Sequence, residues 1–331
     1  MRQRECHRRW LAAIFLAIGW ILIGALPLEA QSSRHRVAVL TPGLSYDPAL
    51  LGLREGLARL GYEEGKNLIF TVEETKGAAA DAVQAAAKRL VEAKPDVFFA
   101  VSTSHTAAAK RATTSVPVVF AWVGDPLRSG FIDSYASSKN NLTGVSIYSV
   151  PLSGKRLEIL KEIDPRVKRV LAMGGAKDVA TEASHPFLDE AGKKLGIQVI
   201  RQDVASKEEI EKLLQGTPKG SVDALYHVPS SVVGVNMHLL IKKSLEDRIP
   251  LVVYEIALVE KGALVAYGGD MRLMGVQAAR LVVKVLKGAN PSDIPVETPE
   301  RNLLGINLTT AKALGIKIPR EVLDKTDRLV D

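Results

Sequence analysis

The sequence predicts an α/β fold made of two doubly wound, parallel-sheet lobes that are joined by a hinge. From residue 36 onward, short apolar runs rich in valine, isoleucine and phenylalanine alternate with segments whose apolar residues recur at helical spacing. This alternation is typical of parallel sheets covered by crossover helices on both faces. It begins again, with similar length, after residues 150–154, which we expect to cross between the lobes.

The first lobe opens with a strand that ends in the turn Thr41-Pro42-Gly43. Asp47 and Pro48 mark a helix start, because aspartate accepts hydrogen bonds from free amides and proline suits the first helical position. A later strand runs into Ser102-Thr103-Ser104, ahead of another helix. The expected elements are strands at 36–40, 68–72, 97–101, 117–123 and 142–147, and helices at 47–60, 81–93 and about 105–113.

The strand at 117–123 is the most informative element of this lobe. It is apolar on both faces, as a strand covered on both sides must be, and it stops in the turn Gly124-Asp125-Pro126. Open α/β sheets bind ligands at the carboxyl ends of their strands. The turn is therefore either one wall of a ligand site or an ordinary turn in which Asp125 caps backbone amides.

The second lobe repeats the pattern. Strands end in Gly174-Gly175, in Pro229-Ser230-Ser231 and in Gly268-Gly269-Asp270, and Ser206 to Glu209 form a capping-box signature for a helix. The expected strands are 170–173, 198–201, 224–227, 251–254, 263–267 and 303–306, and the expected helices are 154–162, 186–195, 206–215, 231–247, 272–287, one from Asn307 or Thr309, and one from Pro319.

The amino terminus has the layout of a signal peptide. Residues 1–9 are basic, residues 10–28 are apolar or small, and Glu29-Ala30-Gln31 follows. We expect residues 1–30 to be a signal peptide cleaved after Ala30. The alternative is a retained membrane anchor, because the apolar run is long enough to span a bilayer. Either arrangement places the rest of the chain outside the cytoplasm.

Composition excludes several classes of function. The net charge of +7 comes from lysines and arginines scattered among acids, with no run of five basic residues, so a nucleic-acid surface is not indicated. The only cysteine, Cys6, precedes the apolar segment, which excludes cysteine catalysis and thiolate metal sites from the mature chain. The six histidines are far apart, and no phosphate-binding, zinc-protease or serine-hydrolase motif occurs. We therefore expect no cofactor, no metal and no catalytic residue.

Five segments resemble a family of exported ABC-transporter substrate-binding proteins, which includes tryptophan/tyrosine-type uptake proteins and has the type I periplasmic-binding fold. The most specific segment is 116–130, with Gly124, Asp125, Pro126, Ser129 and Gly130 at its end. Segments 53–67, 141–163, 266–270 and 306–319 agree in the same order, so the resemblance covers about residues 36–326. Two residues depart from the family pattern: Trp122 stands where a smaller residue is usual, and Gly269 replaces a proline.

The resemblance implies that the lobes enclose a small molecule by hinge closure. It also implies that the chain returns to the first lobe near its end, so lobe 1 is 36–147 plus 271–293 and lobe 2 is 148–270 plus 294–331. The implied partners are an ABC permease with its ATPase, and the implied location is periplasmic or extracytoplasmic. Two alternatives are a membrane-tethered ligand-sensing domain and, as a minor one, a hydrolase on this fold.

We expect the ligand site at the facing strand ends of the two lobes. If the ligand is an amino acid, its carboxylate suits the hydroxyls and amides at residues 102–104, which begin a helix. Its ammonium suits Asp270 or Glu255, and Trp122 is either core or an aromatic wall of the site. The candidate residues are Thr41, Pro42, Gly43, Tyr46, Ser102, Thr103, Ser104, Trp122, Gly124, Asp125, Gly174, Ser230, Tyr254, Glu255 and Asp270.

Overall fold

The computed structural model describes residues 34–43, 46–76 and 78–331, and the fold below concerns the compact unit His35–Asp331. The expected signal peptide at residues 1–30 lies outside the described residues. Within the described residues, no helix is long and apolar enough to cross a membrane.

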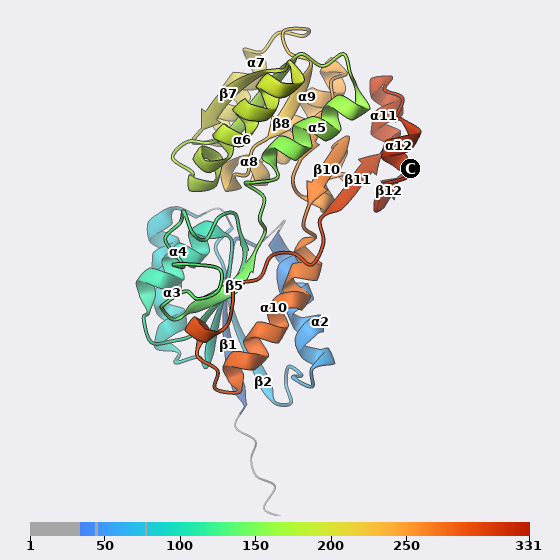
Figure 1. Ribbon diagram of the computed structural model, residues 1–331. Helices are drawn as coiled ribbons and strands as arrows, with labels where there is room; N and C mark the ends of the chain where they lie inside the picture. The colour runs from blue at the N-terminus through green and yellow to red at the C-terminus, as the bar shows by residue number, and fades with distance from the viewer. Residues whose placement is uncertain (1–33, 44–45, 77) are drawn as a thin grey trace, which may run out of the picture. The chain divides into compact units, whose positions relative to one another are not determined.

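The first lobe is built on a five-stranded parallel sheet with the order β2-β1-β3-β4-β5. Figure 1 shows helices α3 and α4 on one face of this sheet and helices α2 and α10 on the other. The strands are β1 (His35–Thr41), β2 (Leu68–Glu74), β3 (Val97–Val101), β4 (Val118–Val123) and β5 (Leu142–Ser146), and the helices are α2 (Asp47–Arg59), α3 (Ala80–Glu92), α4 (Thr103–Ala112) and α10 (Met271–Leu286).

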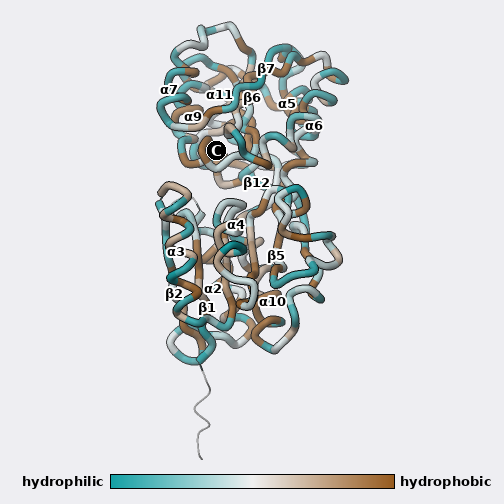
Figure 2. The backbone as a smooth tube through the Cα atoms, turned by 90° about the vertical axis from the view of Figure 1, so that its left-hand side faces the viewer, coloured by the Kyte–Doolittle hydropathy of each residue, from teal (hydrophilic) through white to brown (hydrophobic). Residues whose placement is uncertain are grey.

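Helices α2 and α10 pack at unusually short distance because glycines face each other across the contact. A Cβ placed on Gly52 would lie 1.9 Å from the carbonyl oxygen of Arg272, and one on Gly275 would lie 2.2 Å from that of Ala49. Most of α10 is buried, in agreement with its hydrophobic colouring in Figure 2. The pair thereby covers one face of the sheet, although its helices come from opposite ends of the sequence.

The second lobe is built on a seven-stranded sheet with the order β12-β11-β10-β9-β8-β6-β7. Two hydrophobic clusters fill its two faces, one under α5, α6 and α11 and the other under α7 and α9. The strands are β6 (Arg169–Gly175), β7 (Gln198–Val204), β8 (Ala224–His227), β9 (Leu251–Val253), β10 (Val265–Gly268), β11 (Leu303–Asn307) and β12 (Arg328–Val330), and the helices are α5 (Ser153–Ile163), α6 (Val179–Leu195), α7 (Lys207–Gln215), α8 (Ser231–Val235), α9 (Met237–Asp247), α11 (Leu308–Leu314) and α12 (Arg320–Leu323). Short 3₁₀ helices lie at Ile256–Leu258 (η2) and Pro291–Asp293 (η3).

The two lobes confirm the predicted fold class, with one exception in the direction of the strands. Strand β11 runs antiparallel to β10, and the unpredicted edge strand β12 runs parallel to β11. The reason is connectivity: β10 ends where the chain leaves for α10, whereas β11 begins where the chain returns from the first lobe. Strand β10 therefore ends, and β11 begins, at the same edge of the sheet, so these two neighbouring strands run in opposite directions.

Two helix predictions in the second lobe were wrong. Helix α6 begins at Val179 rather than at Pro186, because Asp178 caps it and the proline lies inside the helix. The helix expected at 231–247 is divided into α8 and α9 at Asn236. Proline is common at the first helical position, so the interior position of Pro186 misled the prediction.

The chain crosses three times between the lobes within residues 35–331. The first crossing joins β5 to α5, the second joins β10 to α10, and the third leads to β11. The third crossing comes later than the expected boundary at residue 294. Ile294 and Val296 lie in the hydrophobic clusters of the first lobe, and the Thr143 hydroxyl donates to the carbonyl oxygen of Ile294 at 2.9 Å. Glu297 pairs with Val145, so this segment extends the open edge of β5 before the chain crosses.

Candidate functional site

A narrow cavity lies between the carboxyl ends of the two sheets. Its volume is about 30 Å³, and both lobes and the first crossing line it. From the first lobe come Tyr46, Ser102, Thr103, Trp122 and Gly124; from the crossing come Ile147 and Ser149; and from the second lobe come Asp178, Ala180, Pro229, Ser230, Ser231 and Tyr254. We refer to this cavity as the cleft.

Seven of the candidate residues line the cleft, and the other eight lie elsewhere. Those in the lining are Tyr46, Ser102, Thr103, Trp122, Gly124, Ser230 and Tyr254. Outside it are Thr41, Pro42, Gly43, Ser104, Asp125, Gly174, Glu255 and Asp270.

Most of the eight residues outside the lining have local roles. Thr41 and Gly43 share a hydrogen bond of 3.3 Å in the turn after β1, where Pro42 lies between them. Gly174 packs against Thr181, and Asp125 accepts a hydrogen bond from the Arg128 amide at 3.0 Å. Ser104 is linked to the cleft lining, because its hydroxyl lies 3.2 Å from that of Ser102.

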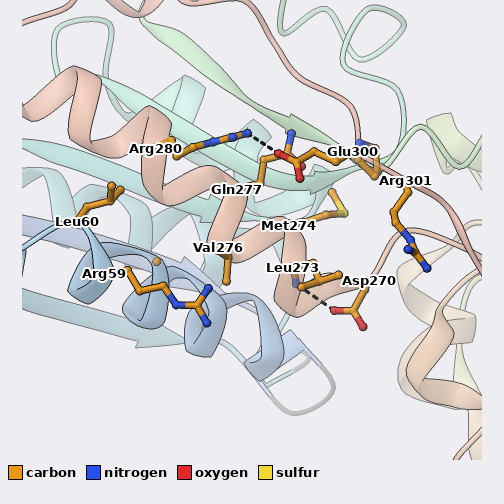
Figure 3. Close-up of a pocket in the computed structure, with 12 residues that line it drawn as sticks. Arg59, Leu60, Asp270, Leu273, Met274, Val276, Gln277, Arg280, Glu300 and Arg301 are labelled. Carbon is orange, nitrogen blue, oxygen red and sulfur yellow. Dashed lines mark hydrogen bonds and ion pairs between the residues drawn. The ribbon is translucent and has the colours of Figure 1, made fainter. Parts of the chain in front are cut away.

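Asp270 belongs to a different cavity, which is shown in Figure 3. Its carboxylate caps α10 by accepting from the Leu273 amide at 3.0 Å, and it also forms an ion pair of 3.7 Å with Arg328. This second cavity has a volume of about 400 Å³ and lies along α2, α10 and the third crossing, with Met274, Gln277 and Arg301 among its lining residues. The structure therefore places Asp270 away from the cleft.

Ser102 is held in a conformation that is normally reserved for glycine. Its φ is 83° and its ψ is 162°, which costs on the order of 1–3 kcal/mol. The hydroxyl lies 2.8 Å from Nδ1 of His105, and Nε2 of that ring lies 2.8 Å from the hydroxyl of Thr75. Burial lowers the pKa of His105 to about 4, so the imidazole is neutral at physiological pH and its partners are hydroxyls. This arrangement holds the Ser102 side chain in place.

Trp122 is the second strained residue of the cleft. Its φ is 62°, and the pairing of β4 with β5 shifts register between Ala121 and Val123. A bulky residue in this region is a genuine outlier, and a bulge of this kind re-aims a side chain. Two adjacent strand ends, those of β3 and β4, thus both carry strained residues that line the cleft.

An aromatic cluster joins the two lobes. The rings of Trp122 and Tyr254 lie 6.3 Å apart at 34°, and the His227 ring lies 4.7 Å from that of Tyr254. Tyr46, which precedes α2, lines the cleft together with Ser231 of the second lobe. Burial raises the pKa of both tyrosines above the ordinary range and lowers that of His227 to about 3. All these rings are therefore uncharged at neutral pH.

Gly124 lies at a close contact between the lobes at the cleft. A Cβ placed on Gly124 would lie 2.9 Å from the Cβ of Ala180 in α6. The turn after β4 therefore contacts the start of α6 through the Ala180 methyl group alone, with no side chain from Gly124. The family-marking glycine is a residue of the interface between the lobes.

Asp178 is the main lining residue that the sequence analysis missed. It caps α6 by accepting from the amides of Ala180 and Thr181 at 2.9 and 3.3 Å. Burial raises its pKa, with these hydrogen bonds acting in the opposite direction. An aspartate a few residues after a strand-ending Gly174-Gly175 was the available signal, but the helix was expected to start at Pro186.

Arg156 lies behind Tyr254 and is fully buried, with 0% exposure. Its Nη1 donates to the carbonyl oxygen of Ser149 at 2.9 Å, and its Nε donates to that of Tyr267 at 2.7 Å. Ser149 belongs to the first crossing, and Tyr267 immediately precedes the second. The guanidinium also lies 5.7 Å from the centre of the Tyr254 ring, which favours a cation–π contact.

Glu255 follows Tyr254 and is 7% exposed. Burial raises its pKa to about 7, with the charge of Lys261 lowering it and that of Asp270 raising it. Among the described residues, no group of three or more His, Cys, Asp or Glu side chains is arranged to hold a metal ion. The chemistry available in the cleft is therefore hydrogen bonding, the half-buried carboxylate of Asp178 and aromatic contact.

Comparisons with known proteins agree with this geometry. Residues 36–330 match the family described as ABC transporter substrate binding protein. A tyrosine-binding protein of Clostridioides difficile (strain R20291) is 28% identical over 274 residues, which are 82% of this chain and 78% of that protein.

Two solved structures bear on the arrangement of the lobes. An ABC domain in complex with L-Trp from Streptococcus pneumoniae is 25% identical, with a TM-score of 0.83, and the match covers 90% of this chain and 100% of that one. A ligand-free, open substrate-binding protein with adhesive properties from Clostridium difficile is also 25% identical, but with a TM-score of 0.69 over 90% and 99% of the two chains. The chain as a whole therefore superposes more closely on the complex than on the open structure. Since the family match spans nearly all described residues, this chain belongs to the ABC transporter substrate-binding proteins and has their type I periplasmic-binding fold.

Proposed function

We propose that this protein is exported and that it encloses an amino acid between its lobes and delivers it to an ABC permease and its ATPase. The observation that carries the proposal is the cleft, to which both lobes contribute hydroxyl groups and helix starts. Hinge closure around a ligand requires such a two-sided lining. Delivery requires no chemistry on the ligand, and the family is one of solute-binding proteins.

The amino end of α4 is the proposed site for the ligand carboxylate. Ser102 precedes this ten-residue helix, and its side chain does not bond to the helix amides, which leaves them free to bind an anion. Ser149 supplies an independent indication: its hydroxyl lines the cleft, is 1% exposed and has no hydrogen-bond partner among the described residues. Buried hydroxyls are normally satisfied, so we assign Ser149 to the ligand as well.

Asp178 is the proposed partner of the ligand ammonium. It takes the role that the sequence analysis gave to Asp270 or Glu255, because it is the carboxylate in the cleft lining. Burial disfavours the ionised form of Asp178, and an ammonium group at hydrogen-bond distance favours it. Ser230 and Ser231 lie on the same side of the cleft and offer further oxygens.

The named relatives support an amino acid as the ligand class. One is called a tyrosine-binding protein, and the other was solved in complex with L-Trp. The α-amino and α-carboxylate groups are common to both ligands and to every other α-amino acid. The part of the proposal that rests on the relatives is therefore confined to these two groups.

A thermal-shift screen of the purified protein with the twenty common L-amino acids tests the proposal. A ligand present at about 100 times its Kd raises the free energy of unfolding by about 2.7 kcal/mol. We expect at least one amino acid to give such a shift and Asp178→Ala to abolish it. Asp189→Ala is the matched control, because Asp189 is exposed on α6 and only pairs with Arg201. The absence of a shift with every amino acid would remove the proposed ligand class, and measurable turnover of a bound compound would support a hydrolase instead.

The mass of the exported protein tests whether residues 1–30 are removed or retained as a membrane anchor. A chain that begins at Gln31 supports a cleaved signal peptide and a free periplasmic receptor. An intact Met1 supports the membrane-tethered alternative.

A further inference from the structure

An apolar groove lies on the second lobe, along helices α8 and α9. It is lined by residues between 234 and 245 and by Leu258 and Lys261, which belong to η2 and the turn after it. Its volume is about 510 Å³, which lies in the usual range of about 300–1,000 Å³ for binding pockets. We refer to it as the α9 groove.

The side chains of the α9 groove are mainly apolar, and some of them are exposed. Met237, Ile241 and Leu258 are buried, whereas Val235 and Leu245 are 39% and 42% exposed. Residues 237, 241 and 245 lie at helical spacing, so they form one face of α9. Exposed aliphatic side chains that line a recess offer an apolar contact to a partner.

The charged residues in the lining are basic. The ionisable side chains are those of His238, Lys242 and Lys261, and within the described part of the chain the lining contains no aspartate or glutamate. Glu246 pairs with Lys242 at 3.8 Å, but both side chains are more than half exposed, and such surface pairs contribute only about 0–1 kcal/mol. Carboxylates on a partner therefore complement the two ammonium groups of this groove.

The larger cavity along α2 and α10 differs in its charge pattern (Figure 3). Arg280 pairs there with Glu300 at 2.9 Å, and Arg301 pairs with Asp327. These guanidinium groups are matched by carboxylates of the chain itself. Charge therefore favours the α9 groove, rather than that cavity, as the surface for an acidic partner.

The α9 groove and the cleft share helix α8. Ser231 at the start of this helix lines the cleft, and Gly234 and Val235 at its end line the groove. A Cβ placed on Gly234 would lie 3.8 Å from Cε1 of His227 and 4.0 Å from the hydroxyl oxygen of Tyr46, which belongs to the first lobe. A partner in the groove therefore contacts a helix that reaches both the cleft and the first lobe.

We propose that the α9 groove is a docking surface for the ABC permease, and that it takes an extracytoplasmic segment in which an apolar side chain is flanked by aspartate or glutamate. The inference rests on the proposed function, because it assumes that a ligand is delivered to a permease. The apolar side chain fills the recess, as anchor residues of interfaces fill pockets, and the carboxylates pair with Lys242 and Lys261. A lipid surface has no protruding side chain that fills a recess, which favours a protein partner.

Uptake of a labelled amino acid by intact cells tests the inference. The chromosomal gene is replaced by Lys242→Glu/Lys261→Glu or by Leu245→Asp, and the label is on the amino acid that gives the largest thermal shift. Both variants should lower uptake at saturating ligand at least about tenfold, because they oppose the charge or the apolar contact of the partner. Calorimetry should give an unchanged Kd for the purified proteins. The matched control is Lys193→Glu/Lys207→Glu, which reverses two exposed lysines on α6 and α7 and should leave uptake unchanged.

Immunoblots establish that each variant is exported in equal amount. Recovery of uptake by the charge-reversed variant, when lysine replaces one extracytoplasmic aspartate or glutamate of the permease, would support the inference and identify the partner residue. Wild-type uptake by the charge-reversed variant would overturn the inference and leave the proposed function standing. If deletion of the gene lowers uptake of none of the twenty amino acids, the proposed function fails together with the inference. If the wild type, but not the charge-reversed variant, sediments with phosphatidylglycerol vesicles, the groove binds a lipid surface and the inference is wrong.

Discussion

At the scale of single residues, the cleft combines strain with buried polar groups. Ser102 and Trp122 hold positive φ angles at the ends of adjacent strands. Strained residues persist only where the surrounding structure determines them, and they are concentrated at functional sites. In Ser102 the strain turns the chain into α4 and leaves the start of this helix facing the cleft.

Two substitutions at Ser102 separate the effect of its backbone strain on stability from the effect of its hydroxyl group. Ser102→Ala and Ser102→Gly both lose the hydrogen bonds with His105 and Ser104. Glycine alone tolerates the φ of 83°, so Ser102→Gly should be more stable than Ser102→Ala by about 1–2 kcal/mol. Urea denaturation measures the difference. If Ser102 had an ordinary, negative φ, Ser102→Ala would instead be the more stable variant, since glycine usually costs about 0.5–1 kcal/mol relative to alanine.

Glu255 makes stability depend on pH in a defined direction. Its folded-state pKa of about 7 lies above the ordinary value of 4.5. Its stabilising contribution to the free energy of unfolding is therefore complete below pH 4.5 and is lost as the pH rises through 7. The shift corresponds to about 3 kcal/mol. The difference in unfolding free energy between the wild type and Glu255→Gln should therefore fall by about this amount between roughly pH 4.5 and 7.5.

The comparison with Glu255→Gln is needed because two histidines act in the opposite direction. The folded-state pKa values of His105 and His227 are lowered to about 4 and about 3, so their contribution is present above about pH 6.5 and is lost at lower pH. Both histidines are retained in the variant and cancel in the difference. A difference that does not vary with pH would show that folding does not raise the pKa of Glu255.

At the scale of helices and strands, two N-caps of the second lobe can be compared. Asp178 caps α6 beside the cleft, and Ser206 caps α7 by accepting from the Glu209 amide. Ser206→Ala and Asp178→Ala should each lower the free energy of unfolding by about 1–2 kcal/mol. Only Asp178→Ala should weaken binding of the amino acid that gives the largest thermal shift. Urea denaturation and calorimetry measure the two effects, and equal loss of affinity in both variants would contradict the role of Asp178.

Periodicity and turn chemistry were enough to predict most elements. Strands β3 and β8 have the predicted bounds, and the caps at Ser206 and Asn307 lie where the side-chain pattern put them. Strand β12 could not be predicted in this way, because three residues at a sheet edge carry little alternation. The direction of β11 follows from the third crossing, which is a tertiary feature.

The candidate site was harder to predict, for a physical reason. A strand end indicates where a ligand can bind, and this signal found Ser102, Gly124 and Ser230. It could not separate them from strand ends such as Gly174, because contact between the lobes decides which of them face the cleft. The bulge that turns Trp122 toward the cleft depends on pairing between β4 and β5, so alternation within β4 alone predicts the wrong face.

At the scale of the whole molecule, the two lobes meet where Gly124 faces Ala180 of α6. Gly124→Ala would place a Cβ 2.9 Å from the Cβ of Ala180, so it should disfavour the closed arrangement and weaken binding by about tenfold, or about 1.4 kcal/mol. Ala180→Gly removes the opposing atom and should restore the affinity in the double variant. Calorimetry on the four proteins of this cycle measures the coupling. Additive effects of the two substitutions would mean that the contact does not govern closure.

The guanidinium of Arg156 has a mechanical consequence for the molecule. It bonds to the carbonyl oxygen of Ser149, in the first connection between the lobes, and to that of Tyr267 in β10, the strand from which the second connection leaves. The first connection and the end of β10 are thereby tied at one point, so neither can slide along the other while the bonds persist. A rotation of one lobe against the other that keeps both bonds has its pivot near Arg156, so atoms close to this side chain move least and those at the far rim of the lobes move most.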